Sequence, residues 1–152
     1  NKLSIKMKQK INKISILKHN NNIRVYYEDT DAGSVVYHAN YLKFAERSRT
    51  EMLRKIKIEQ AILKNEYNIQ FVVKTLFIEY FKPAQLDDLL IIKSVILKIS
   101  SAKIIMEQKI YKKMTLLAKI EVTLGSVNTK GKPSRLPKVV LNSLNSNINP
   151  KE

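Results

Sequence analysis

Apolar and polar residues alternate most regularly between Ala118 and Leu124, near the end of the chain. This period of two predicts a strand with one buried face and one solvent-exposed face. Runs rich in Ile, Val, Leu and Phe follow one another at 70–81, 88–99, 102–112 and 115–127. Because the connections between these runs are short, we predict four successive antiparallel strands.

An earlier segment, from Tyr41 to about Lys57, has the period of an amphipathic helix. One face of this helix is mainly apolar and carries Tyr41, Ala45, Ser48, Met52 and Ile56. The opposite face is charged and carries Lys43, Arg47, Arg54 and Lys57. Asn40 comes directly before this run, so we predict that it caps the helix. A shorter helix is predicted at 59–66, and the β-branched and aromatic run at 23–27 predicts a first strand.

This order of elements, a strand, a long helix and then four strands, fits a curved antiparallel sheet wrapped around one helix. We therefore predict an α+β hot-dog fold with about five strands, although the order alone also fits other α+β folds. A chain of 152 residues supports a single core. We expect one domain at 23–140, a basic extension at 1–22 and a polar C-terminal tail at 141–152.

The extension at 1–22 is rich in lysine and lacks both glycine and proline. One helical stripe of this segment would contain Leu3, Met7, Ile11, Ile14 and Leu17. Such a stripe is typical of a helix that lies on a membrane surface or a partner, and a solvated tail is the alternative. No signal peptide or membrane-spanning run is evident in the sequence. We expect a cytoplasmic protein, with peripheral contact at the inner membrane face through 1–22 as an open question.

The charge of the chain favours anionic partners, because 28 Lys and Arg outnumber 13 Asp and Glu and give a net charge of +15. No helix-turn-helix, zinc or RNA-stacking signature accompanies this charge, so nucleic acid is not expected. The absence of cysteine excludes disulfides, thiolate zinc sites and a cysteine nucleophile. His19 and His38 show no ligand spacing with an acidic cluster, so a dedicated metal site is not expected either.

The residue types that carry chemistry are concentrated between Arg24 and Arg54. The string Tyr27-Glu28-Asp29-Thr30-Asp31-Ala32-Gly33 continues through Val35-Val36-Tyr37-His38-Ala39-Asn40-Tyr41-Leu42 to Glu46-Arg47-Ser48-Arg49. It resembles the signature of the 4-hydroxybenzoyl-CoA thioesterase family and is most similar to the Tol-Pal system-associated acyl-CoA thioesterases (YbgC-like). The resemblance covers about 23–137 and includes Glu79-Tyr80, Pro83-Ala84 and Leu86-Asp87-Asp88.

The resemblance implies an acyl-CoA thioesterase of lipid metabolism in which coenzyme A is part of the substrate and no cofactor is needed. Asp31 then corresponds to the catalytic aspartate of the family, and the backbone N–H of His38 polarises the thioester carbonyl. Family members act on thioesters of coenzyme A or acyl carrier protein and form homodimers or homotetramers, with pockets expected between subunits. Ser34 stands where many relatives have a second glycine.

The chemistry of a thioester agrees with this assignment. A thiol leaving group has a pKa near 8.5, so its departure needs little help from an acid, and a carboxylate with an oxyanion site can suffice. Asp31 could attack the carbonyl or activate a water molecule, and the sequence does not decide between these routes. As an alternative, Asp31 could be an Asx-turn residue. His38 could be a general acid or an orienting residue.

Further candidate site residues follow from the same string. The expected substrate-binding residues are Tyr27, Gly33, Val36, Tyr37, Asn40 and Tyr41. Glu46 and Arg49 are accessory candidates, and we expect Arg49 to pair with a carboxylate across an interface or at the sheet edge.

Two rival functions stay open. A hot-dog dehydratase would pair His38 with Glu46 as acid and base, whereas a non-catalytic scaffold would bind acyl carrier protein or lipid-synthesis enzymes. A conventional serine hydrolase is disfavoured because the chain has no G-x-S-x-G motif.

Overall fold

The computed structural model of the chain describes residues 17–148. The elements in chain order are β1 (Lys18–Arg24), the 3₁₀ turn η1 (Tyr27–Asp29), α2 (Asn40–Lys55), α3 (Gln60–Tyr67), β2 (Gln70–Tyr80), β3 (Leu89–Ile99), β4 (Lys103–Lys112), β5 (Thr115–Val127) and α4 (Lys138–Ile148). The long helix and the last four strands lie close to the predicted positions, because their periodicity is strong.

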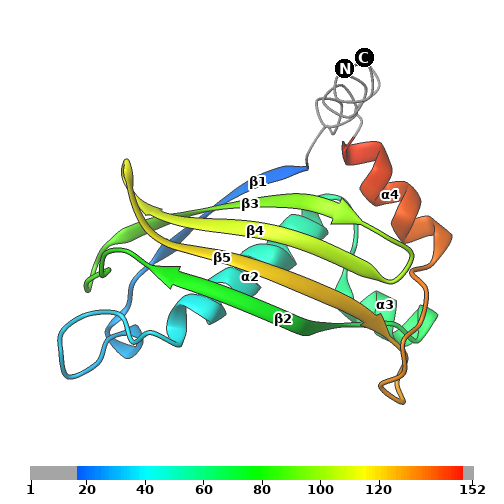
Figure 1. Cartoon of the computed structure of the whole chain (residues 1–152), viewed down its shortest axis with the longest axis horizontal. Helices are drawn as coiled ribbons and strands as arrows, with labels where there is room; N and C mark the ends of the chain where they lie inside the picture. Colours follow the sequence, from blue (N-terminus) through cyan, green and yellow to red (C-terminus); the bar gives the residue numbers. More distant parts are fainter. Residues whose placement is uncertain (1–16, 149–152) are drawn as a thin grey trace, which may run out of the picture.

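The strands form one antiparallel sheet in the order β1-β3-β4-β5-β2. The sheet curves around α2, which lies along one of its faces (Figure 1). The core between helix and sheet contains Phe44 and Met52 of α2 together with inward residues such as Ile92, Ile110 and Ile120. The predicted arrangement of one long helix against a five-stranded sheet is therefore confirmed.

The first strand differs from the prediction, which placed it at 23–27. β1 runs from Lys18 to Arg24 and pairs with β3 along its whole length, so the expected end of the extension at residue 22 lies too late. Leu17 also packs against the core. The remaining members of the predicted stripe, Leu3, Met7, Ile11 and Ile14, lie outside the described residues.

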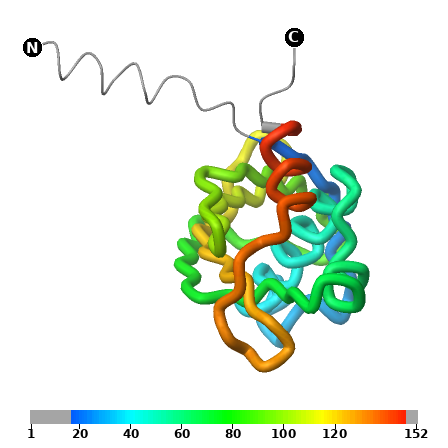
Figure 2. Tube along the Cα trace, turned by 90° about the vertical axis from the view of Figure 1, so that its right-hand side faces the viewer, coloured from blue at the N-terminus to red at the C-terminus, as the bar shows by residue number. Residues whose placement is uncertain are grey.

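The predicted polar tail at 141–152 is also corrected, because α4 extends to Ile148. Val140 and Leu144, one turn apart on this helix, are completely or almost completely buried. The Ser143 hydroxyl donates to the carbonyl of Ile56 at 2.8 Å, which ties α4 to the end of α2. Seen from this end of the molecule, α4 lies in front of the sheet (Figure 2). In the described part of the chain, no helix is both long and apolar enough to cross a membrane.

Candidate active site

Residues 30–39, between η1 and α2, form the loop that carries most of the family signature, and we call it the signature loop. Hydrogen bonds to Asp29 close the base of this loop. The carbonyl of Asp29 accepts hydrogen bonds from the Tyr37 amide and from the Asn40 side chain, both at 2.9 Å. Its carboxylate accepts from the Tyr26 amide at 2.8 Å. α2 begins at Asn40, and the Asn40 side chain makes no capping bond to the helix, so the prediction that Asn40 caps the helix is wrong. Its buried amide anchors the loop instead.

Asp31 lies on the exposed tip of this loop, within a tight turn. Its amide donates to the Val35 carbonyl at 3.0 Å, and its carbonyl accepts from the Ser34 amide at 2.9 Å. Its carboxylate accepts from the Gly33 amide at 2.8 Å, which is the geometry of an Asx turn. One carboxylate oxygen is thereby oriented by the main chain. Ser34 has a φ of 62°, in the left-handed region that favours glycine.

A cavity of about 270 Å³ lies between the loop, the start of α2 and the end of β2. It is lined by Val36, His38, Tyr41, Tyr80, Phe81, Lys82 and Pro83. Three of the predicted site residues therefore meet in one cavity. The other loop residues predicted for the site do not line it: Tyr27, Asp31, Gly33, Tyr37 and Asn40. Tyr27 is 82% exposed, so within one chain it does not form the wall of a binding pocket.

Two tyrosines line this cavity, and one of them, Tyr80, connects it to the loop. The Tyr80 hydroxyl donates to the His38 carbonyl at 2.7 Å, and the buried Tyr41 hydroxyl accepts from the Ala84 amide at 3.0 Å. Their rings meet edge to face, with centroids 5.4 Å apart. Burial raises the pKa of Tyr41, and burial together with the neighbouring Tyr41 raises the pKa of Tyr80. Both hydroxyls are therefore protonated at neutral pH.

The backbone N–H of His38 donates to no protein acceptor within the described residues. It lies in the turn that leads into α2, where the Asn40 amide donates to the Tyr37 carbonyl at 2.8 Å. The imidazole is exposed and lies against the Tyr37 ring, with centroids 4.5 Å apart. A free amide beside a helix N-terminus can stabilise negative charge on an oxygen.

Glu46 and Arg49 line a different, smaller cavity of about 110 Å³ between α2 and β2. Arg49 is 7% exposed and donates to the Gln108 side chain at 3.0 Å. It forms no ion pair with a carboxylate among the described residues of this chain, and pairing across an interface stays a prediction. The Gln108 amide in turn donates to the Ala45 carbonyl and the Ser94 hydroxyl, both at 2.9 Å. Burial lowers the pKa of Arg49, and Glu46 acts against this shift. This network joins α2 to the middle of the sheet.

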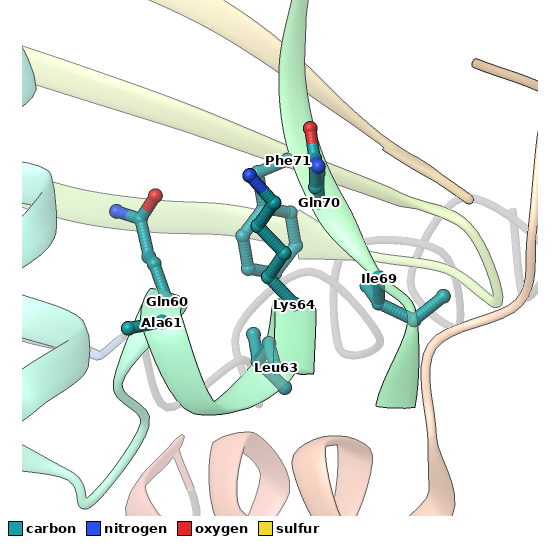
Figure 3. Close-up of a pocket in the computed structure, with 7 residues that line it drawn as sticks. All are labelled: Gln60, Ala61, Leu63, Lys64, Ile69, Gln70 and Phe71. Atoms are coloured by element: carbon teal, nitrogen blue, oxygen red, sulfur yellow. The ribbon is translucent and has the colours of Figure 1, made fainter. Parts of the chain in front are cut away.

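A further cavity of about 270 Å³ lies between α3 and the start of β2. Gln60 and Lys64 rise from α3 beside Phe71 and Gln70 of β2 (Figure 3). Its lining holds one cation and no carboxylate or histidine, so it lacks an acid–base pair. Within residues 17–148, no three His, Asp or Glu side chains gather as metal ligands would.

The sequence prediction missed the contribution of β2 to the cavity. Tyr80 and Pro83 belong to the string that resembles the thioesterase family, but no role was assigned to them or to their neighbours Phe81 and Lys82. They lie beside His38 because β2 pairs with β5 and because the Tyr80 hydroxyl donates to the His38 carbonyl, 42 residues away in the sequence. The signal in the sequence was the presence of Glu79-Tyr80 and Pro83-Ala84 among the residues that resemble the thioesterase family.

Comparison with known proteins agrees with the fold. The model of the thioesterase-like superfamily matches residues 25–144, so the chain belongs to this superfamily. An acyl-CoA thioesterase, YbgC, of Haemophilus influenzae is 47% identical over 119 residues, covering 78% of this chain and 88% of the relative. The acyl-CoA thioester hydrolase YbgC of Escherichia coli O6:H1 is 46% identical over 121 residues, covering 78% and 90%.

A solved structure is also similar. The crystal structure of a probable thioesterase from Bartonella henselae superposes with a TM-score of 0.77 and 40% identity, covering 79% of this chain and 99% of that chain. Together with the strand order, this similarity confirms the predicted α+β hot-dog fold.

Proposed function

We propose that this protein hydrolyses acyl-CoA thioesters to a free acid and coenzyme A, with Asp31 as the catalytic carboxylate. The observation that carries the proposal is the loop itself. It presents an oriented carboxylate at Asp31 and a free amide at His38 only seven residues later, beside a helix N-terminus. The family and the YbgC relatives support the reaction class. The cytoplasm, with its reducing conditions, suits a chain without cysteine.

The reaction needs water and no separate cofactor. The His38 amide donates to the thioester oxygen as negative charge develops there, and the thiolate leaves when the tetrahedral intermediate collapses. Asp31 either accepts a proton from the attacking water or attacks the carbonyl to form an anhydride that water then hydrolyses. Both routes release the same acid and thiol. The Asx-turn bond from Gly33 holds one carboxylate oxygen and leaves the other available.

The proposed catalyst assembles as a homo-oligomer, a dimer or a tetramer, because one chain leaves Asp31 at the surface. A second surface is required to enclose a substrate there. The edge strand β2 offers an apolar contact for another copy, since Val73, Phe77 and the following Phe81 are 50%, 63% and 51% exposed. These residues lie on the same edge as Tyr80, which bonds to the loop. A second copy at β2 would therefore approach the reactive residues.

The test of this function is a series of acyl-CoA substrates of increasing chain length, with acyl carrier protein thioesters beside them. Thiol release by the wild type is compared with that by Asp31→Asn and Glu46→Gln, and hydration or dehydration of 3-hydroxyacyl thioesters is assayed in parallel. We expect Asp31→Asn to lower hydrolysis by about 10²–10⁴-fold. We expect Glu46→Gln to retain hydrolysis, because Glu46 is exposed and, among the described residues, accepts a hydrogen bond only from the Thr50 hydroxyl.

Dehydration that depends on Glu46, with no hydrolysis, would instead favour the dehydratase. Binding of carrier protein without turnover of any thioester would favour the scaffold. The mass of each variant in solution gives the oligomeric state in the same experiment.

A further inference from the structure

The backbone of His38 is restrained from both sides. In the peptide group before it, the Tyr37 carbonyl accepts from the Asn40 amide at 2.8 Å. In the peptide group after it, the His38 carbonyl accepts from the Tyr80 hydroxyl at 2.7 Å. A peptide group is planar and trans, so fixing its carbonyl also fixes the direction of its N–H. The first bond directs the His38 amide, and the second prevents the following peptide from rotating and carrying His38 with it.

The Tyr80 hydroxyl is the one long-range restraint of this pair. It comes from the last residue of β2, whereas the Asn40 bond is local. The Tyr80 ring is oriented by Tyr41, with an angle of 76° between the two planes. Tyr41 is in turn 2% exposed and accepts from the Ala84 amide. The raised pKa of Tyr80 keeps its hydroxyl a donor throughout the neutral range.

We propose that Tyr80 is a positioning residue for the proposed thioester hydrolysis, acting through the backbone of His38. This inference rests on the proposed function and assigns a role that the loop sequence alone does not contain. Tyr80 touches neither the reacting carbon nor the leaving group in this role. Its hydroxyl holds the oxyanion amide in the direction that the transition state requires, and small misplacements of such a group are costly to the chemical step.

The test is Tyr80→Phe, which removes the hydroxyl and keeps the ring against Tyr41. The matched control is Tyr111→Phe on β4, where the ring contacts Lys93 and the hydroxyl has no hydrogen bond among the described residues. With the best substrate of the acyl-CoA series, we expect Tyr80→Phe to lower kcat by about 10–100-fold while KM stays within about twofold. Tyr111→Phe should match the wild type in both constants.

A second measurement separates positioning from a loss of stability. The carbonyl stretch of the same acyl-CoA, labelled with ¹³C at the thioester carbon, is recorded bound to Asp31→Asn and to Asp31→Asn with Tyr80→Phe. We expect the band to lie below its frequency in water in the first variant and to move back towards it in the second. This shift does not depend on turnover or on the melting temperature.

The outcomes are distinguishable. If the wild type hydrolyses no acyl thioester, the proposed function fails and the role of Tyr80 falls with it. If the wild type is active, but Tyr80→Phe keeps both its kcat and its carbonyl frequency, only the inference about Tyr80 is overturned. A fall in melting temperature with an unchanged kcat for the folded protein would overturn it as well.

Discussion

The two ends of the sheet are stabilised by different forces. At the end where β2 finishes and β3 begins, hydrogen bonds dominate: the Val36 N–H of the signature loop donates to the Ala84 carbonyl at 2.9 Å, and Lys112 pairs with Asp88 of the neighbouring turn at 2.8 Å. At the opposite end, α4 is fixed largely by burial of Val140 and Leu144, with one bond from Ser143. The two ends lie far apart in Figure 1.

This difference follows from what each end has to do. A loop that presents a carboxylate and a free amide to a ligand cannot bury them, so burial cannot be its main restraint. Directional hydrogen bonds can hold an exposed backbone in one conformation at a small net gain in stability. A helix without reactive groups can rely on apolar contacts. Changes at the α4 end should therefore alter stability, and changes at the loop end should alter activity or the response to pH.

Leu144→Ala tests the α4 end and should have the largest effect. The side chain is completely buried, so its truncation should lower the free energy of unfolding by about 2–5 kcal/mol. The kcat of the folded protein should not change. Urea denaturation gives the first quantity, and Val139→Ala, at a position 53% exposed, is the control that should cost far less. A loss of kcat at full folding would show that the two ends are coupled.

Gly33→Ala tests the loop end. A Cβ at this position would lie 3.0 Å from Asp31 Oδ1, so the carboxylate would have to shift by a few tenths of an ångström. Because Asp31 is exposed, we expect little change in melting temperature but a fall in kcat of about tenfold, equivalent to about 1.4 kcal/mol. Steady-state kinetics and thermal denaturation measure the two effects. Unchanged activity in this variant would argue against an oriented role for Asp31.

Asp88→Asn tests the charged bonds of the loop end. Burial acts to raise the pKa of Asp88, but the bonds from Lys112 and from the Gln85 amide outweigh it, so the pKa lies below its usual value. A lowered folded-state pKa stabilises the protein above the unfolded pKa of about 3.9, and this contribution is lost as pH falls through the folded-state value.

The expected loss in Asp88→Asn is about 0.5–1 kcal/mol at pH 7, and it should disappear as the pH falls below about 4. Urea denaturation at several pH values measures it. An equal deficit at pH 7 and at pH 3 would show that the carboxylate charge is not the cause. Leu144→Ala serves as the comparison, since its deficit should not follow this pH dependence.

Ser34→Gly should have the smallest effect, and in the opposite direction. The φ of 62° strains a residue with a side chain, and glycine removes this strain while adding freedom to the unfolded chain. We expect a net gain of about 0.5 kcal/mol in stability with kcat unchanged. Ser101→Gly, at an exposed position without a positive φ, should instead be neutral or destabilising. A destabilised Ser34→Gly would mean that the side chain contributes a contact.

Most of the fold could be predicted because its period is strong. The strands at 70–81 and 115–127 were predicted to within a residue, since alternation and β-branched composition agree there. β1 was misplaced because its three consecutive asparagines are poor strand formers, and pairing with the apolar β3 overrides that preference. α4 was missed because the residues after Leu141 are mostly Asn and Ser, which made the segment read as a polar tail.

The site was predictable only where it is local. The loop from Asp31 to His38 is contiguous, so its string could be compared with a family. Tyr80 reaches the loop through tertiary contacts, which no local pattern contains. Arg49 was expected to meet a carboxylate because a buried cation usually does, but the facing residue on β4 is Gln108. Predicting that partner requires the register of the helix on the sheet.

The two edges of the sheet set a limit on growth. The outward positions of β1 are Lys18, Asn20, Asn22 and Arg24, whereas β2 exposes valine and phenylalanine. If two copies join through β2, the apolar edge strand of each chain is covered. The polar edge strand β1 then disfavours the addition of a third chain to the sheet. Such an asymmetry favours a closed particle over a fibre, even at the high protein concentrations inside a cell.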